Sequence, residues 1–246
     1  MTVSDRSCVV ITGAGGALGS AFIDHYLARS RRVIGLDISL PDTHASSDNL
    51  VLRRVDIASS DELHAILSET IDKKERIGIL LNAAGLIWNE SVVSLKDGRL
   101  SVHGLLSWRN AIEANLTAPF VAAAVVAERM ARQGGGSIVN FSSISSVGNI
   151  GQSAYSAAKA GLEAATRVMA AELGPLGIRA NAIALGFIDV GSTRKAVTEE
   201  RLAEYLRRTP VGRLGAIDDV ISAVEFLEQN SFINGEIVRV DGGLRL

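Results

Sequence analysis

The 246-residue chain contains few cysteines, prolines or aromatic residues, and it has no excess of charge of either sign. Its single cysteine, Cys8, excludes an internal disulfide framework and a metal site built from several cysteines. The net charge is -2, from 25 Lys and Arg against 27 Asp and Glu, which argues against a dedicated binder of nucleic acid or anionic membranes. The four histidines lack the spacing of a metal site, so no metal is expected.

Long hydrophobic runs are also missing. The longest, Phe120 to Ala127, is bounded by Pro119 and Glu128 and falls far short of the roughly 20 residues that span a bilayer. The apolar stretch Val9 to Ile11 runs directly into glycines and lacks the hydrophobic region of a signal peptide. We therefore expect a soluble, reduced, cytoplasmic protein without a membrane or nucleic-acid partner.

The residues that are abundant favour a globular α/β fold. Hydrophobic residues make up 47% of the chain, which is enough for one substantial core, and 24 glycines against 4 prolines suit repeated strand-to-helix turns. Short β-branched runs predict strands at 8–12, 32–37, 50–55, 77–82, 137–141, 179–184 and 236–240. Amphipathic stretches predict helices at 17–29, 60–73, 107–132, 154–173, 199–208 and 217–228. This alternation predicts a single doubly wound, Rossmann-like domain over residues 1–246, with a central, mostly parallel seven-stranded sheet flanked by helices.

Two connections are longer than such a fold needs, residues 86–106 and 186–210. Both follow strands at the carboxyl edge of the sheet, where open α/β folds bind ligands. We interpret them as the walls of a substrate pocket; the alternative is that they are variable surface loops.

The first strand runs into a glycine-rich turn that opens the first predicted helix. A strict G-x-G-x-x-G would start at Gly13 and Gly15, but its third glycine position is Leu18, and the glycine is displaced to Gly19, after Ala17. Glycines at such a turn let a pyrophosphate reach backbone N–H groups at the helix N-terminus. The turn by itself would also fit a tight strand-to-helix connection that binds no ligand.

An acidic residue, Asp37, ends the second predicted strand, where a carboxylate can accept hydrogen bonds from both ribose hydroxyls of an adenosine. The same charge repels a 2′-phosphate. Ile38 follows it and no Lys or Arg lies in the glycine turn, so the sequence favours NAD(H) over NADP(H). The alternative role for Asp37 is a capping or turn residue.

Tyr155 and Lys159 are four residues apart at the start of a predicted helix, which puts both side chains on one face. An ammonium beside a phenol stabilises the phenolate, so the Tyr155 pKa is expected to fall toward the working pH. Tyr155 could then pass a proton to or from a substrate oxygen. The alternative is a helix that merely exposes a Tyr and a Lys.

The order of these motifs is specific. The displaced-glycine turn, then Asn82-Ala83-Ala84-Gly85 after the fourth strand, then Tyr155-x-x-x-Lys159, resembles the short-chain dehydrogenase/reductase family over essentially the whole chain. The resemblance implies an oxidoreductase that moves a hydride to or from a nicotinamide, with Lys159 also holding the nicotinamide ribose. It further implies a homo-oligomer, a tetramer or a dimer.

The resemblance also calls for a serine that positions the substrate oxygen, and two are available. Strand register favours Ser143, whereas the usual separation of 13 residues from Tyr155 favours Ser142. We predict Ser143, because the strand determines the serine and a loop can absorb a deletion, and we keep Ser142 as the alternative. Asn115 matches the family's helix asparagine, whose backbone carbonyl and local distortion hold a water in the proton relay; a packing asparagine is the alternative.

Further cofactor contacts are carried over from the family. They are Asp56, Ile57, Asn82, Ala83, Gly85, Gly186 and Ile188, in addition to Gly13, Gly15, Ala17, Leu18, Gly19, Asp37, Ile38, Tyr155 and Lys159. The chain departs from the pattern at Leu185, where relatives usually have Pro, and at Val190, where they have Thr. Ser192 or Thr193 would have to replace the missing hydroxyl.

Together these features predict an NAD(H)-dependent oxidoreductase that interconverts a secondary alcohol and a ketone, acting on a small-molecule substrate. One alternative is a 3-oxoacyl thioester reductase acting on an acyl-carrier-protein or CoA substrate, which the stretch from Gly148 to Gln152 resembles. Asp37 argues against it, since biosynthetic reductases mostly use NADPH. A second alternative is a non-catalytic dinucleotide-binding protein, against which the intact Tyr155 and Lys159 argue.

Overall fold

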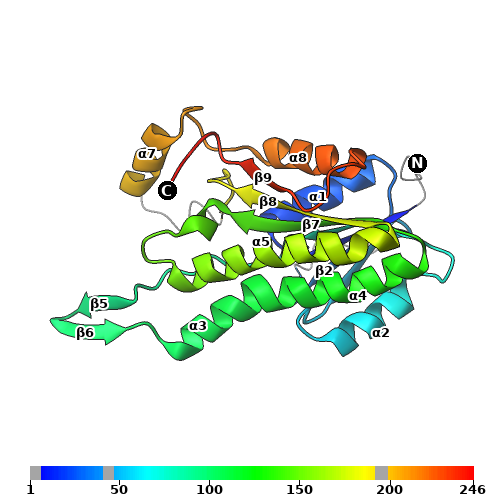
Figure 1. Cartoon of the computed structure of the whole chain (residues 1–246), viewed down its shortest axis with the longest axis horizontal. Helices are drawn as coiled ribbons and strands as arrows, with labels where there is room; N and C mark the ends of the chain where they lie inside the picture. Colours follow the sequence, from blue (N-terminus) through cyan, green and yellow to red (C-terminus); the bar gives the residue numbers. More distant parts are fainter. Residues whose placement is uncertain (1–6, 41–46, 192–198) are drawn as a thin grey trace.

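The computed structural model describes residues 7–40, 47–191 and 199–246. A seven-stranded sheet lies at its centre, with all neighbouring strands parallel, in the order β3-β2-β1-β4-β7-β8-β9 (Figure 1). The strands are β1 (Cys8–Thr12), β2 (Val33–Asp37), β3 (Leu50–Arg54), β4 (Ile77–Asn82), β7 (Gly136–Ser143), β8 (Ile178–Leu185) and β9 (Ile237–Val240). The predicted doubly wound fold is confirmed, and each of the seven predicted strands is present to within a few residues.

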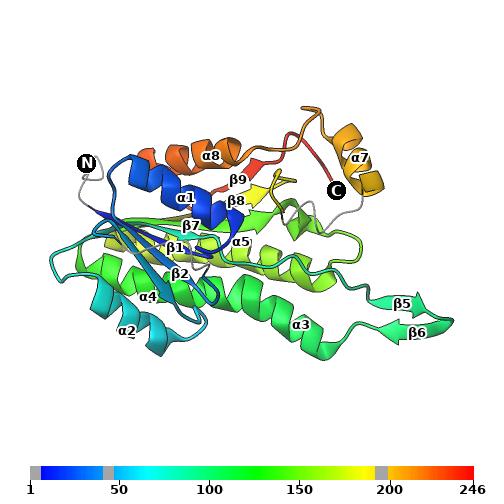
Figure 2. The same cartoon turned by 180° about the vertical axis from the view of Figure 1, so that it is seen from behind.

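Helices cover both faces of this sheet (Figures 1 and 2). They are α1 (Ala17–Ala28), α2 (Ser60–Thr70), α3 (Leu105–Ile112), α4 (Ala118–Arg132), α5 (Ser153–Leu173), α7 (Glu199–Arg208) and α8 (Ile217–Gln229). A π-helical turn, Glu113–Thr117, joins α3 to α4, so the predicted helix at 107–132 is continuous but distorted.

The core is divided by the sheet, which explains why the strands are apolar throughout. Along β1, Cys8 and Val10 pack in one cluster with α2, α4 and α5, whereas Val9 and Ile11 pack in the other with α1 and α8. Side chains alternate between faces along a strand, so a strand covered on both sides needs apolar residues at consecutive positions.

A chain of buried polar side chains crosses the carboxyl half of the sheet. Asn82 on β4 accepts a hydrogen bond from Thr12 Oγ1 at 3.2 Å, and its amide donates to Asn140 Oδ1 on β7 at 2.9 Å. Asn140 in turn donates to Thr166 Oγ1 of α5 at 2.9 Å. Because buried polar groups need partners, this chain of bonds favours the register in which the ends of β1 and β4 lie beside Asn140 of β7.

The connection from β4 to α3 contains a hairpin that the sequence analysis did not predict. Strands β5 (Val93–Lys96) and β6 (Arg99–Val102) pair antiparallel and are joined by Asp97 and Gly98, both with positive φ, as in a type I′ turn. Figures 1 and 2 show this hairpin extending away from the body of the molecule. Most of residues 86–106 therefore forms a projecting arm and does not line a pocket.

The run Leu105–Arg132 is long and apolar enough to cross a membrane by length and composition alone, but half of its most apolar window is buried inside the protein. Eight residues of α4 are buried, and those that belong to a core cluster pack in the one that also contains α2 and α5. The apolar composition of this helix is thus accounted for by its contact with the sheet.

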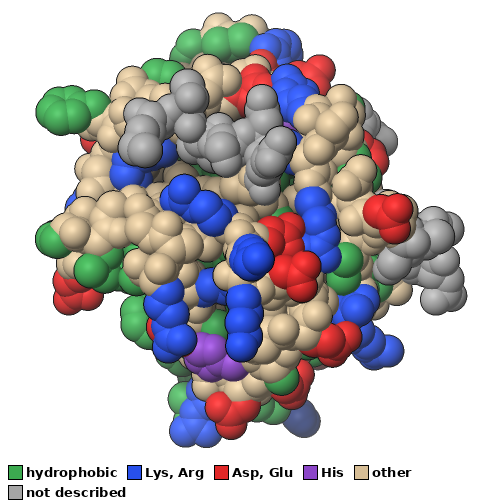
Figure 3. Space-filling view, turned by 90° about the vertical axis from the view of Figure 1, so that its right-hand side faces the viewer, with side chains coloured by type: hydrophobic (Ala, Val, Ile, Leu, Met, Phe, Trp, Pro, Cys, Tyr) green, Lys and Arg blue, Asp and Glu red, His purple; other side chains and the backbone are tan. Residues whose placement is uncertain are grey.

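The face at the amino ends of the strands carries interspersed charges of both signs (Figure 3). Arg31 pairs with Glu228 at 2.7 Å and Arg32 with Glu75 at 2.5 Å near this face. Positive and negative side chains are therefore interspersed on this face, in keeping with the near-neutral charge of the whole chain.

Candidate active site

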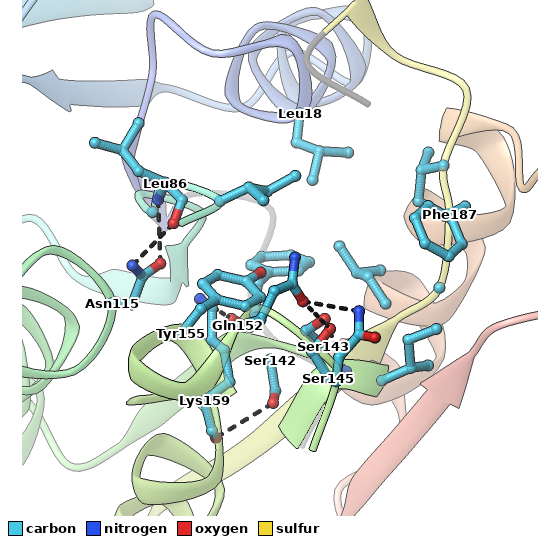
Figure 4. Close-up of a pocket in the computed structure, with 18 of the residues that line it drawn as sticks. Leu18, Leu86, Asn115, Ser142, Ser143, Ser145, Gln152, Tyr155, Lys159 and Phe187 are labelled. Atoms are coloured by element: carbon cyan, nitrogen blue, oxygen red, sulfur yellow. Dashed lines mark hydrogen bonds between the residues drawn. The ribbon is translucent and has the colours of Figure 1, made fainter. Parts of the chain in front are cut away.

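A cavity of about 190 Å³ opens at the carboxyl edge of the sheet (Figure 4). Its walls come from the segments that follow β4, β7 and β8, and from the first turns of α1 and α5. Of the residues predicted to act in catalysis or cofactor binding, it is lined by Leu18, Ala83, Gly85, Asn115, Ser142, Ser143, Tyr155, Lys159, Gly186 and Ile188. The fold thus brings together side chains that are up to 170 positions apart in the sequence, from Leu18 to Ile188.

Tyr155 and Lys159 lie one turn apart on α5, as the spacing predicts. Lys159 is fully enclosed; its Nζ donates to the carbonyl oxygen of Phe141 at 2.8 Å and lies 5.7 Å from the centre of the Tyr155 ring. The Ser143 hydroxyl lies close enough to the Tyr155 phenol to lower the pKa of the phenol. A phenol, an ammonium group and a hydroxyl therefore meet in one cavity, which is lined by both polar and apolar side chains.

The expected fall of the Tyr155 pKa is not what the structure shows. Burial raises the pKa of the Tyr155 phenol, and the neighbouring Ser143 hydroxyl lowers it by less. Burial also lowers the pKa of Lys159 to about 8. The expectation considered only the attraction between ammonium and phenolate, whereas loss of water around both groups is the larger effect.

The two candidate serines have different surroundings. Ser143 Oγ faces Tyr155 and accepts a hydrogen bond from the backbone N–H of Ser145 at 3.1 Å. Ser142 Oγ donates to Glu163 Oε1 at 2.7 Å. Side chains alternate along β7, so its end can present only one of the two serines to the phenol, and here it is Ser143.

Asn115 lies in the π-helical turn between α3 and α4 and is completely buried. Its amide nitrogen donates to the carbonyl oxygens of Ala111 and Leu86, and its Oδ1 accepts from the Leu86 N–H at 3.1 Å (Figure 4). A Cβ atom on Gly85 would lie 2.9 Å from Asn115 Oδ1 and 3.3 Å from Lys159 Nζ. Asn115 thus holds the segment after β4 against the lysine, at a site where only glycine fits.

The glycine turn has two structural requirements. Gly13 has a positive φ of 71°, and a Cβ there would lie 2.6 Å from the backbone nitrogen of Ala84. Gly19 is buried in α1, and its Cβ would lie 2.1 Å from the carbonyl oxygen of Gly13. Gly19 therefore permits close packing of helix on turn, and its contact to the cofactor stays a prediction.

The N-terminus of α1 fits a pyrophosphate. Gly15 and Ala17 are exposed, and the N-cap residue Gly16 offers no side-chain hydrogen bond to the first turn. Backbone N–H groups at an uncapped helix N-terminus attract anions. The Leu18 side chain points from this turn toward the cavity (Figure 4), so the turn and the cavity are continuous.

Asp37 ends β2 beside this turn. Its carboxylate accepts hydrogen bonds from the backbone N–H groups of Gly15 and Ser39, both at 2.9 Å. The neighbouring side chain of Ile38 is 63% exposed, and Arg54, the register partner of Asp37 on β3, donates from Nε to the Ile38 carbonyl at 2.8 Å. The carboxylate is thus held at the outer end of the glycine turn, where the adenosine half of a dinucleotide would lie.

The remaining predicted contacts differ in what they can offer. Ile57 and Asn82 are both buried: Ile57 packs in the core, and Asn82 belongs to the polar chain across the sheet, so neither side chain is available to a ligand. Asp56 accepts from the Ala58 N–H at 2.9 Å at the start of α2. Gly186 permits a close approach to Asp241, whose Cα would lie 2.7 Å from its Cβ.

The two predicted walls contribute unequally. Leu86, Ile87 and Asn89 line the cavity, but the rest of residues 86–106 does not. From residues 186–210, the cavity is lined by Gly186, Phe187, Ile188, Val190 and Tyr205. Ser192 and Thr193, considered above as replacements for a missing hydroxyl, lie outside the described residues.

Two features of the cavity were not predicted. Phe187 stacks on Tyr205 with ring centres 4.0 Å apart, which closes one side. Gln152 accepts hydrogen bonds from Ser145 and Asn149 and donates to Asn89 Oδ1 at 2.8 Å. The stretch from Gly148 to Gln152 was noted only for its family resemblance, since nothing local indicates that Gln152 joins two segments 63 positions apart.

Among the described residues, no group of three or more His, Cys, Asp or Glu side chains is placed to hold a metal ion. The parallel sheet, the glycine turn at a helix N-terminus and the enclosed Tyr-Lys-Ser group instead define a dinucleotide-dependent oxidoreductase of the Rossmann type.

Comparison with known proteins agrees with this class. A family model described as Enoyl-(Acyl carrier protein) reductase matches residues 37–245. The short-chain reductase protein NovJ of Streptomyces niveus is 31% identical, covering 99% of this chain and 95% of its own. The 3-oxoacyl-[acyl-carrier-protein] reductase FabG of Escherichia coli is 32% identical over 96% of both chains.

Two solved structures share the fold over nearly the whole chain. Levodione reductase superposes with a TM-score of 0.84 at 26% identity, covering 98% of this chain and 97% of its own. The 3-hydroxyacyl-CoA dehydrogenase type-2 of Mycobacterium avium superposes with a TM-score of 0.86 at 27% identity, covering 100% and 98%. The chain belongs to the short-chain dehydrogenase/reductase family, whose members bind a nicotinamide dinucleotide.

Proposed function

We propose that this protein uses NAD(H) to interconvert a secondary alcohol and a ketone, with Tyr155 as the acid/base. The observation that carries the proposal is the enclosed contact of Tyr155 with Ser143, beside a lysine whose ammonium reaches the same cavity. A cavity in which a phenol, a hydroxyl and an ammonium group lie close together suits one carbonyl or carbinol group of a small substrate.

Each of four residues has its own role in the proposed reaction. Ser143 donates a hydrogen bond to the substrate oxygen and holds it against the phenol, while Tyr155 delivers the proton in reduction or accepts it in oxidation. Lys159 stabilises the phenolate and Asn115 holds the adjoining segment in place. When bound, the nicotinamide supplies or accepts the hydride.

Paired substitutions test the proton-transfer group. Tyr155→Phe is expected to lower kcat by roughly 10²–10⁴-fold, the usual contribution of a positioned acid/base. Ser143→Ala should lower kcat by about 10²-fold or more, because it removes a donor to the reacting oxygen. Ser142→Ala is the matched control, since Ser142 contacts Glu163 and should retain most of the activity. Equal losses in the two serine variants would contradict the assignment of Ser143.

The preference for NAD(H) is supported by Asp37, whose carboxylate lies beside the glycine turn and would repel a 2′-phosphate on a dinucleotide bound there. Asp37→Ser should lower kcat/KM for NAD by about 10- to 100-fold, the value of one or two hydrogen bonds to a charged group. It should raise kcat/KM for NADP, with Arg54 available to the phosphate. In Asp37→Ser/Arg54→Ala the gain for NADP should disappear. An unchanged cofactor ratio in Asp37→Ser would refute the preference.

A second candidate substrate class is a 3-oxoacyl thioester. The names of two similar proteins, the FabG reductase and the 3-hydroxyacyl-CoA dehydrogenase, support it, as does the position of Asn149 and Gln152 in the cavity wall. Turnover of acetoacetyl-CoA compared with a panel of simple ketones, each with NADH and NADPH, separates the two classes. Cofactor binding without turnover of any substrate would instead indicate a non-catalytic dinucleotide-binding protein. A cytoplasmic location and a homo-oligomer remain part of the proposal.

A further inference from the structure

The hairpin formed by β5 and β6 has one apolar face that no described part of the chain covers. Val93 pairs with Val102, and Leu95 with Leu100. Because paired residues and alternate residues share a face, these four side chains lie together on one side. Between 53% and 76% of each is exposed. A two-stranded hairpin is marginally stable by itself in water, so this face is expected to be covered in the working protein.

The exposed apolar surface continues beyond the hairpin into α3. Leu105 and Leu106 begin this helix, and they are 64% and 71% exposed. We call these two residues together with Val93, Leu95, Leu100 and Val102 the arm patch. At the ordinary size of valine and leucine, it exposes on the order of 700 Å², close to what one partner contributes to a standard protein interface. It exceeds the apolar patches usual on a monomer, about 300–600 Å².

The arm is held firmly at its base. The Glu90 carboxylate accepts hydrogen bonds from the Gly104 N–H at 2.7 Å and from the Ser107 hydroxyl, which in turn accepts from Trp88 Nε1 at 2.6 Å. The His103 N–H donates to the Val92 carbonyl at 2.9 Å. A surface held in one orientation loses little entropy on binding, which favours a role as a docking element.

We propose that the arm patch is an interface with a second copy of this chain. Its members are all Val or Leu, so it offers no charge complementarity to an acidic or basic partner. An uncharged patch can be complementary to itself across a two-fold axis, where each copy presents the same surface. The arm extends past the body in both views (Figures 1 and 2), so two arms can meet without the bodies colliding.

This interface would also support the candidate active site. The Glu90 N–H donates to the Gly151 carbonyl at 2.8 Å, and Gln152 donates to Asn89 at 2.8 Å, so the base of the arm is bonded to the segment that leads into α5. Tyr155 lies in the first turn of that helix. Covering the arm patch would therefore stabilise one wall of the cavity, without supplying a catalytic group.

Matched double substitutions on the two faces of the hairpin test the proposal. Leu95→Lys/Leu100→Lys places two charges on the arm patch, whereas Ser94→Lys/Ser101→Lys places the same charges on the opposite face, where the register puts this serine pair. The molar mass measured by light scattering should fall, in the leucine variant, to half or less of that of the wild-type assembly. In the serine variant it should stay unchanged. Circular dichroism confirms that both remain folded. A monomeric wild type, retention of the assembly in the leucine variant, or equal dissociation of both variants would overturn the proposal.

A photoreactive leucine analogue at position 100 provides a test that leaves the surface apolar. Irradiation of the purified full-length protein should give a covalent dimer, with the crosslink mapped by mass spectrometry to a residue of a second copy. The same analogue at Leu63, a fully buried position in α2, should give crosslinks only within one chain. Absence of an intermolecular crosslink at position 100 would also overturn the proposal.

Discussion

Lys159 is predicted to make the folded protein less stable at neutral pH. Its side chain is 4% exposed, and burial lowers its pKa from 10.5 to about 8. A pKa shift of one unit corresponds to about 1.4 kcal/mol, so this lowered pKa means that holding the ammonium in the folded state costs about 3 kcal/mol. The hydrogen bond from Nζ to Phe141 returns about 1 kcal/mol. Lys159→Met should therefore stabilise the protein by about 2 kcal/mol at pH 7 while abolishing turnover.

The stabilisation expected from Lys159→Met depends on pH. Between pH 8 and 10.5 the unfolded chain keeps the Lys159 proton while the folded protein has released it, so the wild type gains stability as pH rises. Below pH 8 both states are protonated and the burial cost is fully present. The stabilisation by Lys159→Met should thus be largest at pH 7 and vanish by about pH 10.

Urea unfolding of the cofactor-free protein at pH 7 and pH 10 measures the effect. Lys74→Met is the control, because Lys74 is exposed and its substitution should change the free energy of unfolding by less than about 0.5 kcal/mol at both pH values. A Lys159→Met protein that is less stable than wild type at pH 7, or equally stabilised at both pH values, would refute the reasoning.

Two further predictions concern the cavity. Gly85→Ala should lower kcat at least tenfold in steady-state assays, because the new Cβ would displace Asn115 or Lys159; full activity in this variant would show that the segment can shift freely. Phe187→Ala should raise KM for the substrate about tenfold with kcat nearly kept, since it removes one ring of the stack with Tyr205 and about 1–2 kcal/mol of apolar contact. Steady-state kinetics separate this outcome from a loss confined to kcat, which would count against Phe187 as a binding residue.

Sequence patterns predicted the sheet well because their cause is local. Residues such as Val9 and Val10 are apolar in succession because each faces a different helical layer, and that requirement is visible without knowing which helices pack there. The relative position of Tyr155 and Lys159 can also be predicted from sequence, since a helix places residues four positions apart on one face. The hairpin after β4 is harder to predict, because its only local signal is the Asp97-Gly98 turn and its apolar residues would equally suit a pocket wall.

Whether a feature can be predicted from the sequence depends on how far apart along the chain the residues that determine it lie. The sequence by itself determined the parallel α/β fold, the glycine turn and the spacing of Tyr155 and Lys159, since each depends on residues a few positions apart. Only the tertiary structure decided which serine meets the phenol, that Gly19 serves packing, and that burial moves the Tyr155 pKa upward. These depend on desolvation and on contacts between segments far apart in the sequence, which no local pattern encodes.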